Sequence, residues 1–306
     1  MLPVTRLRAV FMKLSTVLCN YNTRDELARA LESLLATQGD LDQEIIVVDN
    51  ASRDGSAAMV RARFPSVTVI EAGANRWFSG GNNLGLRAAQ GEYALILNPD
   101  TILQPDTLAT LVDYLDGHPT VGAVTARMTF ADGTLQRNGS RFPTFADALL
   151  SYTFLGVLFP RWRARRRRAM WYEDWDRLST RAVEVAPGSC LMARRTILAQ
   201  IGYFDERLKL FFTDDDLCRR IVGTGAAIHY VAEAVLIHDE HASLSQVPRL
   251  TQRIYWQDLL TYTRIYHGRV AAWTLALLLL PTRAAMAARR GLYATRSERP
   301  QRTAAD

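Results

Sequence analysis

The sequence contains few cysteines and almost no lysine, and its apolar C-terminal run is too short to cross a membrane. The three cysteines, Cys19, Cys190 and Cys218, are widely separated and odd in number. This argues against a disulfide framework and for a reducing compartment, and we expect all three to be packed thiols. The apolar run at 270–280 has eleven residues, whereas a membrane-spanning helix needs roughly 17–25.

The usual glycine-rich phosphate loops are also absent. No Gly-x-Gly-x-x-Gly follows the first predicted strand, and no Gly-Lys-Ser/Thr sequence occurs. A nucleotide would therefore be held by side chains, together with a metal. The first residues lack the apolar segment and the small-residue cleavage site of a signal peptide, and we expect 1–12 to be a disordered extension.

The net charge of +6 comes almost entirely from arginine, because Lys13 and Lys209 are the only lysines. The arginines concentrate at 161–168 and 283–302, and a basic patch suits phosphates, nucleic acid or an anionic membrane surface. Segment 142–181 is aromatic and basic without regular periodicity, so we expect a long loop. It is either a solvated charged turn or a flap that meets a phosphate-bearing or membrane-bound substrate. No nucleic-acid recognition module accompanies the arginines, and we expect no nucleic-acid partner.

Alternation of buried strands with helices predicts an α/β fold with a mostly parallel sheet. The first four strands are predicted at 14–19, 44–48, 67–70 and 93–97. Later strands are predicted at 121–128, 183–193, 226–231 and 234–237. The C-terminal quarter is helical. Its tryptophan, apolar run and flanking arginines favour a helix lying in a membrane interface, with a core-packed helix as the alternative.

Polar residues follow the fourth predicted strand directly. Asn98, Pro99 and Asp100 come after five buried positions, and ligands in open α/β sheets sit outside the carboxyl ends of strands. A carboxylate at that edge could hold a metal bound to phosphate oxygens. The alternative is an ordinary strand-ending turn.

Two further sites carry charged or metal-binding side chains. Asp214, Asp215 and Asp216 are consecutive at a predicted helix start. A helix N-terminus favours negative charge, but repulsion among three carboxylates requires a partner or a function for at least one. His238 ends a late strand, where it could ligate a metal or simply pack.

Taken in order, these segments closely resemble the family 2 glycosyltransferases of the GT-A fold, in particular the bacterial rhamnosyltransferase-like branch. The motifs that carry the resemblance are 18–22, 47–55, 75–85, 97–101, 214–220 and 235–238. The resemblance covers about 13–245. It implies a glycosyltransferase domain at 13–245. From the composition of the remaining chain we expect a helical, membrane-associated region at 246–294 and a disordered tail at 295–306.

The resemblance assigns a role to each matching position. It places Asn20, Tyr21 and Asn22 in the nucleotide pocket, Asp49, Asn50 and Ser52 at the base and ribose, and Asn75 and Asn83 near the diphosphate and donor sugar. Asn98 and Asp100 occupy the family's Asp-x-Asp position, so that Asp100 would hold Mg²⁺ or Mn²⁺. Asp214 matches the general base, and His238 falls where a residue meets the metal or diphosphate.

The sequence departs from the family pattern at three positions. Asn98 replaces the first aspartate of Asp-x-Asp, and Thr213 stands where glutamate is usual before the base, which leaves the register of the aspartate run open by one residue. Trp77 stands where glycine is common, which could reshape the donor-sugar pocket.

The resemblance implies an inverting transferase that moves a sugar from a nucleotide-diphosphate donor, with dTDP-rhamnose favoured. The acceptor would be a saccharide or lipid-linked saccharide in cell-surface polysaccharide synthesis. We expect a cytoplasmic protein bound peripherally at the inner face of the cell membrane. Two alternatives stay open: a transferase of another hexose, and a non-catalytic sugar-nucleotide-binding subunit of a polysaccharide assembly complex.

Overall fold

The computed structural model describes residues 12–37, 41–239 and 248–286. The predicted extension, apart from Met12, and the predicted tail at 295–306 lie outside the described residues. The chain divides into two compact units. Unit 1 comprises residues 1–142 and 171–259, and unit 2 comprises 143–170 and 260–306. Unit 2 therefore combines an internal segment with the C-terminal part of the chain.

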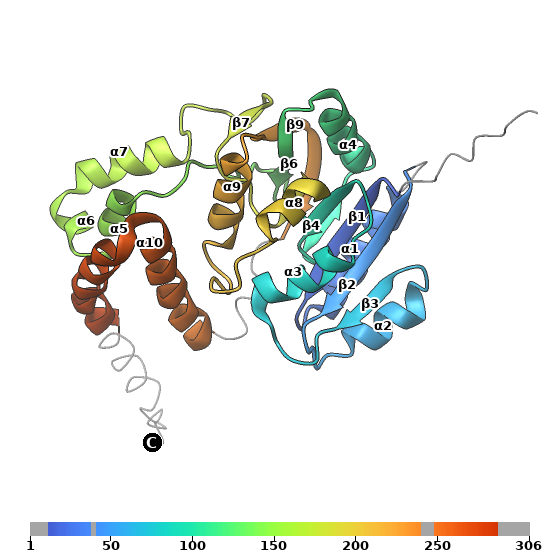
Figure 1. The fold of residues 1–306 in the computed structure, drawn as a ribbon, viewed down its shortest axis with the longest axis horizontal. Helices are drawn as coiled ribbons and strands as arrows, with labels where there is room; N and C mark the ends of the chain where they lie inside the picture. Colours follow the sequence, from blue (N-terminus) through green and yellow to red (C-terminus); the bar gives the residue numbers. More distant parts are fainter. Residues whose placement is uncertain (1–11, 38–40, 240–247, 287–306) are drawn as a thin grey trace, which may run out of the picture. The chain divides into compact units, whose positions relative to one another are not determined.

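Unit 1 is built on a mixed sheet whose N-terminal half is parallel (Figure 1). The first four strands are β1 (Leu14–Asn20), β2 (Gln43–Asp49), β3 (Thr68–Glu71) and β4 (Tyr93–Leu97). They lie in the order β3-β2-β1-β4, and every pairing among them is parallel. The predicted α/β arrangement with a parallel central sheet is confirmed.

The other half of the sheet mixes directions. It contains β5 (Thr101–Leu103), β6 (Val121–Thr129), β7 (Arg181–Val183), β8 (Cys190–Arg194) and β9 (Ala227–His238). β8 is antiparallel to β4 and β6, whereas β6 and β9 are parallel. The two late strands predicted at 226–231 and 234–237 form the single strand β9. They were predicted as two because the apolar pattern is interrupted where the pairing of β9 with β6 shifts register, between Val231 and Val235. The strand predicted at 183–193 is divided into β7 and β8.

Helices cover both faces of this sheet. One face packs against α1 (Arg24–Ala36), α2 (Ser56–Arg63) and α4 (Thr107–Gly117). The other packs against α3 (Trp77–Ala88), α8 (Arg195–Ile201) and α9 (Thr213–Gly223). Strand β4 serves both cores: Leu95 and Leu97 face the first and Ile96 faces the second. Such two-sided burial explains why these strands are continuous apolar runs.

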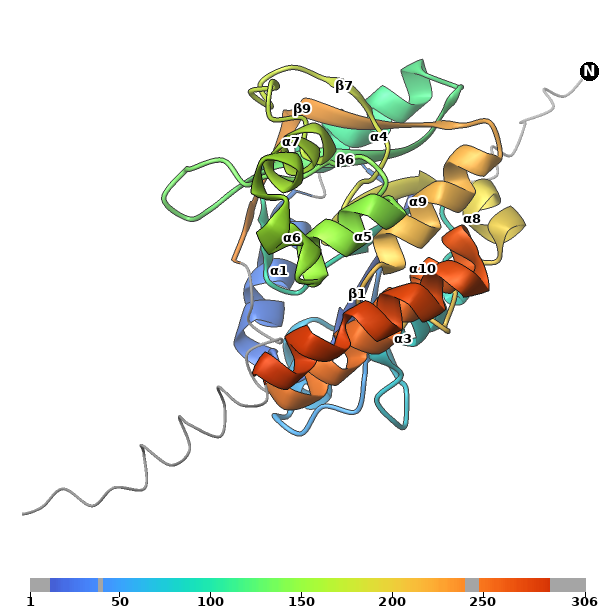
Figure 2. The same ribbon diagram turned by 90° about the vertical axis from the view of Figure 1, so that its left-hand side faces the viewer.

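The arginine-rich segment, predicted as a loop, is helical in unit 2. It forms α5 (Phe145–Tyr152), α6 (Leu155–Leu158) and α7 (Pro160–Met170) (Figure 2). Arg166 attaches α7 to α5, because its Nε donates to Asp147 at 2.6 Å and its Nη2 donates to the Thr144 hydroxyl at 2.7 Å. The prediction was wrong because α7 buries none of its side chains, and it therefore shows no apolar stripe to read.

The C-terminal helix α10 (Pro248–Leu278) begins in unit 1 and continues in unit 2. Gly268 breaks it with φ 88° and ψ 170°, a backbone conformation that glycine adopts without steric cost. Backbone hydrogen bonds of helical spacing continue beyond it, from Leu279 to Leu275 and from Arg283 to Leu279. Within the described residues, no helix is both long enough and apolar enough to cross a membrane.

Candidate active site

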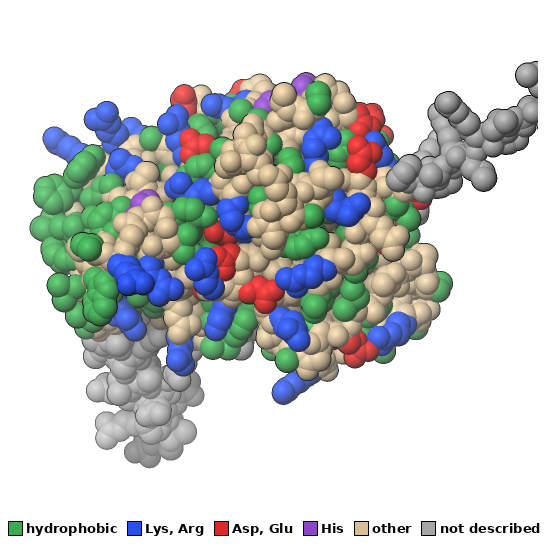
Figure 3. Space-filling view, in the orientation of Figure 1, with side chains coloured by type: hydrophobic (Ala, Val, Ile, Leu, Met, Phe, Trp, Pro, Cys, Tyr) green, Lys and Arg blue, Asp and Glu red, His purple; other side chains and the backbone are tan. Residues whose placement is uncertain are grey.

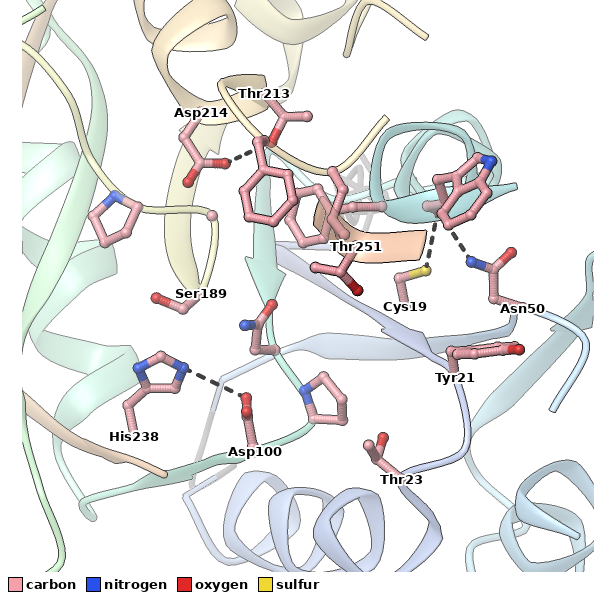
Figure 4. A pocket seen from close by; sticks show the side chains of 18 of the residues that line it. Cys19, Tyr21, Thr23, Asn50, Asp100, Ser189, Thr213, Asp214, His238 and Thr251 are labelled. Carbon is pink, nitrogen blue, oxygen red and sulfur yellow. Dashed lines mark hydrogen bonds and ion pairs between the residues drawn. The ribbon is translucent and has the colours of Figure 1, made fainter. Parts of the chain in front are cut away.

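A pocket of about 670 Å³ opens in unit 1 where the parallel strands end (Figure 4). β1, β2 and β4 run in the same direction, so the residues that follow them meet at one edge of the sheet. Seven predicted site residues line the pocket: Tyr21, Asn50, Asn75, Asn98, Asp100, Asp214 and His238. The remaining predicted residues, Asn20, Asn22, Asp49, Ser52 and Asn83, lie outside its lining.

Asp100 and His238 face each other in this pocket (Figure 4). Asp100 follows β4 and His238 ends β9, and the carboxylate Oδ1 lies 3.5 Å from the imidazole Nε2. Both atoms are buried, and neither has a hydrogen-bond partner among the described residues. The other ring nitrogen, Nδ1, lies 3.1 Å from Oε1 of Gln136, which fixes the ring.

A divalent cation fits this pair, because it would coordinate two buried polar atoms that have no hydrogen-bond partner in the described part of the chain. Within the described part of the chain, no group of three or more His, Cys, Asp or Glu could hold a metal ion. A cation here would therefore take Asp100 and His238 from the protein and complete its shell with phosphate oxygens and water.

Asp214 lies in the first turn of α9 and borders the turn 187–189 (Figure 4). The Thr213 hydroxyl donates a hydrogen bond to its Oδ1 at 3.0 Å. A side chain at Gly188 would come within 2.7 Å of the same oxygen, so glycine permits this close approach. Burial raises the pKa of Asp214, and hydrogen bonds from the Gly188 backbone and Thr213 offset only part of that effect. A raised pKa suits a carboxylate that must take up a proton.

The other two aspartates have different surroundings. Burial, with a smaller contribution from the charge of Asp214, raises the pKa of Asp215 to about 7, but Asp215 does not line the pocket. Asp216 is buried and accepts a hydrogen bond from Nη2 of Arg220 at 2.6 Å. Arg220 also donates to the carbonyl of Tyr203 at 2.6 Å. Asp216 and Arg220 thus anchor α9 to the segment after α8, and Asp214 is the aspartate that faces the pocket.

Asn50 organises the turn at the start of α3. Its Nδ2 donates to Oδ1 of Asn75 and to the carbonyl of Trp77, both at 3.1 Å. Its Oδ1 accepts from the backbone N–H of Arg76 at 2.7 Å. This turn holds Trp77 at φ 63°, the left-handed region that favours glycine. The Trp77 ring lines the pocket, with Nζ of Lys209 5.7 Å from its centroid.

A hydrogen-bonded network outside the lining holds the loop after β2. Nδ2 of Asn20 donates to the hydroxyl of Ser52 at 3.1 Å, and the N–H of Ser52 donates to Oδ2 of Asp49 at 3.2 Å. The N–H of Arg53 donates to Oδ1 of Asn22 at 2.7 Å. These residues fix the backbone that presents the neighbouring pocket side chains, and Oδ1 of Asp49 is buried without a hydrogen-bond partner among the described residues.

Asn83 lies apart from the pocket and is fully buried in α3. Its Nδ2 donates to the carbonyl of Phe204 at 3.0 Å and to Oε1 of Glu206 at 2.9 Å. Its Oδ1 accepts from the N–H of Phe204 at 2.9 Å. The amide therefore connects α3 to the segment after α8.

Several pocket residues were not predicted from the sequence. Ser189 lies in the turn 187–189 between β7 and β8, and Leu250 and Thr251 come from the start of α10. One sign of the turn was present in the sequence, the interruption of a predicted strand by Pro-Gly-Ser. Nothing in the local sequence indicated that the predicted C-terminal helix would reach the pocket. One carboxylate of α10 also reaches the site: Oδ2 of Asp258 accepts from the backbone N–H groups of Lys209, Leu210 and Phe211 at 3.1, 2.9 and 3.0 Å.

The family model described as "Glycosyl transferase family 2" matches residues 15–202. The chain belongs to glycosyl transferase family 2. This agrees with the order of strands and with the pocket at their carboxyl ends, and it makes the protein a glycosyltransferase. The resemblance noted in the sequence is thereby confirmed.

Relatives of known function include rhamnosyltransferases. The chain is 29% identical over 251 residues to the N-acetylglucosaminyl-diphospho-decaprenol L-rhamnosyltransferase of Mycobacterium tuberculosis, with 77% of this chain and 78% of that protein covered. It is 25% identical over 242 residues to rhamnosyltransferase WbbL of Escherichia coli K12, with 74% of this chain and 83% of that protein covered.

Solved structures confirm the GT-A fold of this family 2 member. The mannosyltransferase PcManGT from Pyrobaculum calidifontis, in complex with GDP-Man and Mn²⁺, superposes with a TM-score of 0.57 at 21% identity over 92% of this chain and 80% of that one. TarS 1–349 of S. aureus in complex with UDP-GlcNAc gives a TM-score of 0.54 at 19% identity, covering 80% and 65% of the two chains.

Proposed function

We propose that this family 2 glycosyltransferase transfers rhamnose from dTDP-rhamnose, with inversion, to a saccharide or lipid-linked saccharide at the inner face of the cell membrane. One observation carries the proposal: the Asp214 carboxylate, with its raised pKa, lines the same pocket as Oδ1 of Asp100 and Nε2 of His238, which have no hydrogen-bond partner among the described residues. Asp214 would supply the base, and Asp100 and His238 would supply the place for the donor diphosphate.

The donor end rests on Asp100 and His238. These two side chains would hold Mg²⁺ or Mn²⁺, which stabilises the negative charge that develops on the leaving diphosphate. The complex of PcManGT with GDP-Man and Mn²⁺ supports a divalent cation that binds together with the nucleotide sugar. Tyr21, Asn50 and Asn75 line the pocket beyond β1 and β2, where the nucleoside and the donor sugar would lie. The proposed rhamnose donor rests on the names of the two rhamnosyltransferase relatives.

The acceptor end rests on Asp214. As the acceptor hydroxyl oxygen bonds to the anomeric carbon, the bond from that carbon to the diphosphate oxygen breaks. The hydroxyl proton passes to the Asp214 carboxylate, which acts as general base. Attack from the face opposite the leaving group inverts the configuration. Thr213 orients the carboxylate through its hydroxyl.

The test is a panel of nucleotide sugars, first screened by thermal stabilisation with Mg²⁺ or Mn²⁺ and then by turnover. We expect dTDP-rhamnose to give the largest stabilisation and to be slowly hydrolysed without an acceptor. With a lipid-linked saccharide acceptor, the product linkage would be inverted. Turnover of a different hexose donor and not of dTDP-rhamnose would refute the proposed donor. Binding of donors without any turnover would indicate a non-catalytic sugar-nucleotide-binding subunit.

A further inference from the structure

The second half of α10 leaves an apolar stripe exposed to solvent. Val270, Trp273 and Leu277 follow one another at three- and four-residue spacing, which places them on one helix face, and they are 82%, 78% and 66% exposed. Leu280 continues the spacing. Leu275, on the opposite face, is fully buried. The helix therefore has one buried apolar face and a second that is exposed to solvent.

The junction of α6 and α7 presents a second exposed apolar group. Val157 and Leu158 are 77% and 62% exposed, and Phe159 and Trp162 are also exposed. Figure 1 and Figure 2 both place α6 and the second half of α10 on the same side of unit 2. Figure 3 shows hydrophobic side chains gathered on that side, with Lys and Arg side chains beside them. Clusters of exposed large apolar side chains usually mark an interaction surface.

Positive charge borders these apolar side chains. Helix α7 has six arginines and no acidic residue, a charge equal to the net charge of the whole chain. Arg166 forms an ion pair with Asp147 of α5. Other arginines of α7 are exposed, among them Arg161, Arg163, Arg165 and Arg167. The segment 268–286 likewise contains arginines and no acidic residue.

We propose that unit 2 binds the surface of an anionic lipid bilayer. In this arrangement, Trp273 and Leu277 enter the interface together with the apolar side chains of the α6–α7 junction, and the arginines of α7 contact anionic headgroups. Tryptophan and aliphatic residues on one helix face, with arginines beside them, are the composition of interfacial helices. The choice of a lipid surface rests on charge complementarity, and its biological purpose, access to a lipid-linked acceptor, rests on the proposed function.

The test is co-sedimentation of the full chain with vesicles. One set contains about 30% phosphatidylglycerol in phosphatidylcholine, and the other contains phosphatidylcholine alone. We expect at least roughly tenfold tighter binding to the anionic set, weakened by salt. The double variant Trp273→Ser/Leu277→Ser should lose at least about tenfold in binding to the anionic set. A fourfold Arg→Gln variant at 161, 163, 165 and 167 should reduce the preference for anionic vesicles.

Control variants change an exposed leucine and four exposed arginines in unit 1. Leu178→Ser alters a leucine that is 58% exposed, and Arg→Gln changes at 29, 61, 63 and 87 remove four exposed arginines. Both controls should bind vesicles like the parent. Equal binding by the parent and the stripe variant, when both unfold at the same temperature, would overturn the proposal. So would a parent dimer that the stripe variant converts to monomer without any vesicle binding, because a second copy would then occupy the surface.

The vesicle assay and the transferase assay test two different proposals, and the result of one does not decide the other. Donor hydrolysis without vesicles should be unchanged in both stripe and arginine variants, since none of these residues lines the pocket. Vesicle binding by a protein that turns over no donor would refute the proposed function and leave the lipid surface standing. Donor turnover by a protein that does not bind anionic vesicles would support the proposed function and refute the lipid-binding surface.

Discussion

Oδ1 of Asp100 lies 3.5 Å from Nε2 of His238, and within the described residues neither atom has a hydrogen-bond partner. A bound cation would turn two costly buried atoms into ligands. Asp100→Ala should therefore abolish the metal dependence of nucleotide binding and leave the fold intact, as measured by calorimetry with and without Mg²⁺ or Mn²⁺. Gln136→Ala removes the partner of the other His238 nitrogen and should weaken metal binding by about tenfold.

The control for these variants is Asp106→Asn, which changes an exposed carboxylate between β5 and α4 that does not line the pocket. It should bind nucleotide and metal like the parent. Nucleotide affinity that does not respond to the metal in the parent would refute a metal role for Asp100 and His238.

Much of the parallel half-sheet and of the strand-end site could be predicted from the sequence. Buried strands such as Tyr93–Leu97 are apolar on both faces, and polar residues directly after them must lie at the pocket edge. The contribution of α10 could not be predicted. Asp258 contacts backbone groups 47 to 49 residues away, and only the tertiary fold brings Thr251 to the pocket. Helix α7 was missed because a helix with no buried face carries no periodic signal.

Trp77 gives a test of backbone strain at the pocket. Its φ of 63° costs a tryptophan about 1–3 kcal/mol and costs glycine little. Trp77→Gly and Trp77→Ala both remove the ring, but only glycine relieves the strain. We therefore expect the glycine variant to be more stable than the alanine variant by about 1 kcal/mol in urea unfolding, the reverse of their usual order within a helix. Equal stability of the two variants would show that the position is not strained.

The same pair of variants probes the donor pocket. Because the Trp77 ring lines the pocket beside Asn75, its removal should change the ranking of nucleotide sugars in the stabilisation screen. The change should be alike in Trp77→Gly and Trp77→Ala. An unchanged ranking in both would mean that the ring does not contact the donor sugar.

Asp258 positions the segment that leads to the base. Its Oδ2 accepts three backbone hydrogen bonds from residues 209–211, and it is buried in α10. Asp258→Ala leaves these donors without their acceptor and should cost about 3 kcal/mol of unfolding free energy. Asp258→Asn keeps an acceptor, so it should recover part of both stability and kcat. Donor affinity should change little in either variant. A loss of stability without any change in kcat would restrict Asp258 to a purely structural role.

We expect Asp215 to make the stability of the protein depend on pH. Its pKa in the folded state is raised to about 7 from an ordinary value of 3.8. The folded state therefore binds more protons than the unfolded state between these values, and the parent loses stability as the pH rises toward and through 7. Asp215→Asn removes that loss and should raise Tm by roughly 2–4 °C at pH 8.5, with a much smaller difference at pH 4. A constant Tm difference across this range would exclude a raised pKa at Asp215.

Asp214→Asn tests the general base directly. The change keeps size and some hydrogen bonding but cannot take the proton, so kcat should fall by about 10²–10⁴-fold with donor affinity nearly unchanged. In the parent, kcat should decline as the pH falls, because burial raises the pKa of Asp214 and protonation removes the base. Asp215→Asn should have a much milder effect on kcat, since that side chain does not line the pocket.

Variants of the three aspartates can be distinguished by whether they lower Tm or kcat. Asp216→Asn weakens the ion pair with Arg220 and should lower Tm more than it lowers kcat. Asp214→Asn should do the opposite, with Tm unchanged or higher because a buried charge is removed. Near-normal turnover by Asp214→Asn together with a large loss in Asp215→Asn would move the base one residue along α9. Full activity in both variants would remove the base from this helix, and another group would then have to accept the proton.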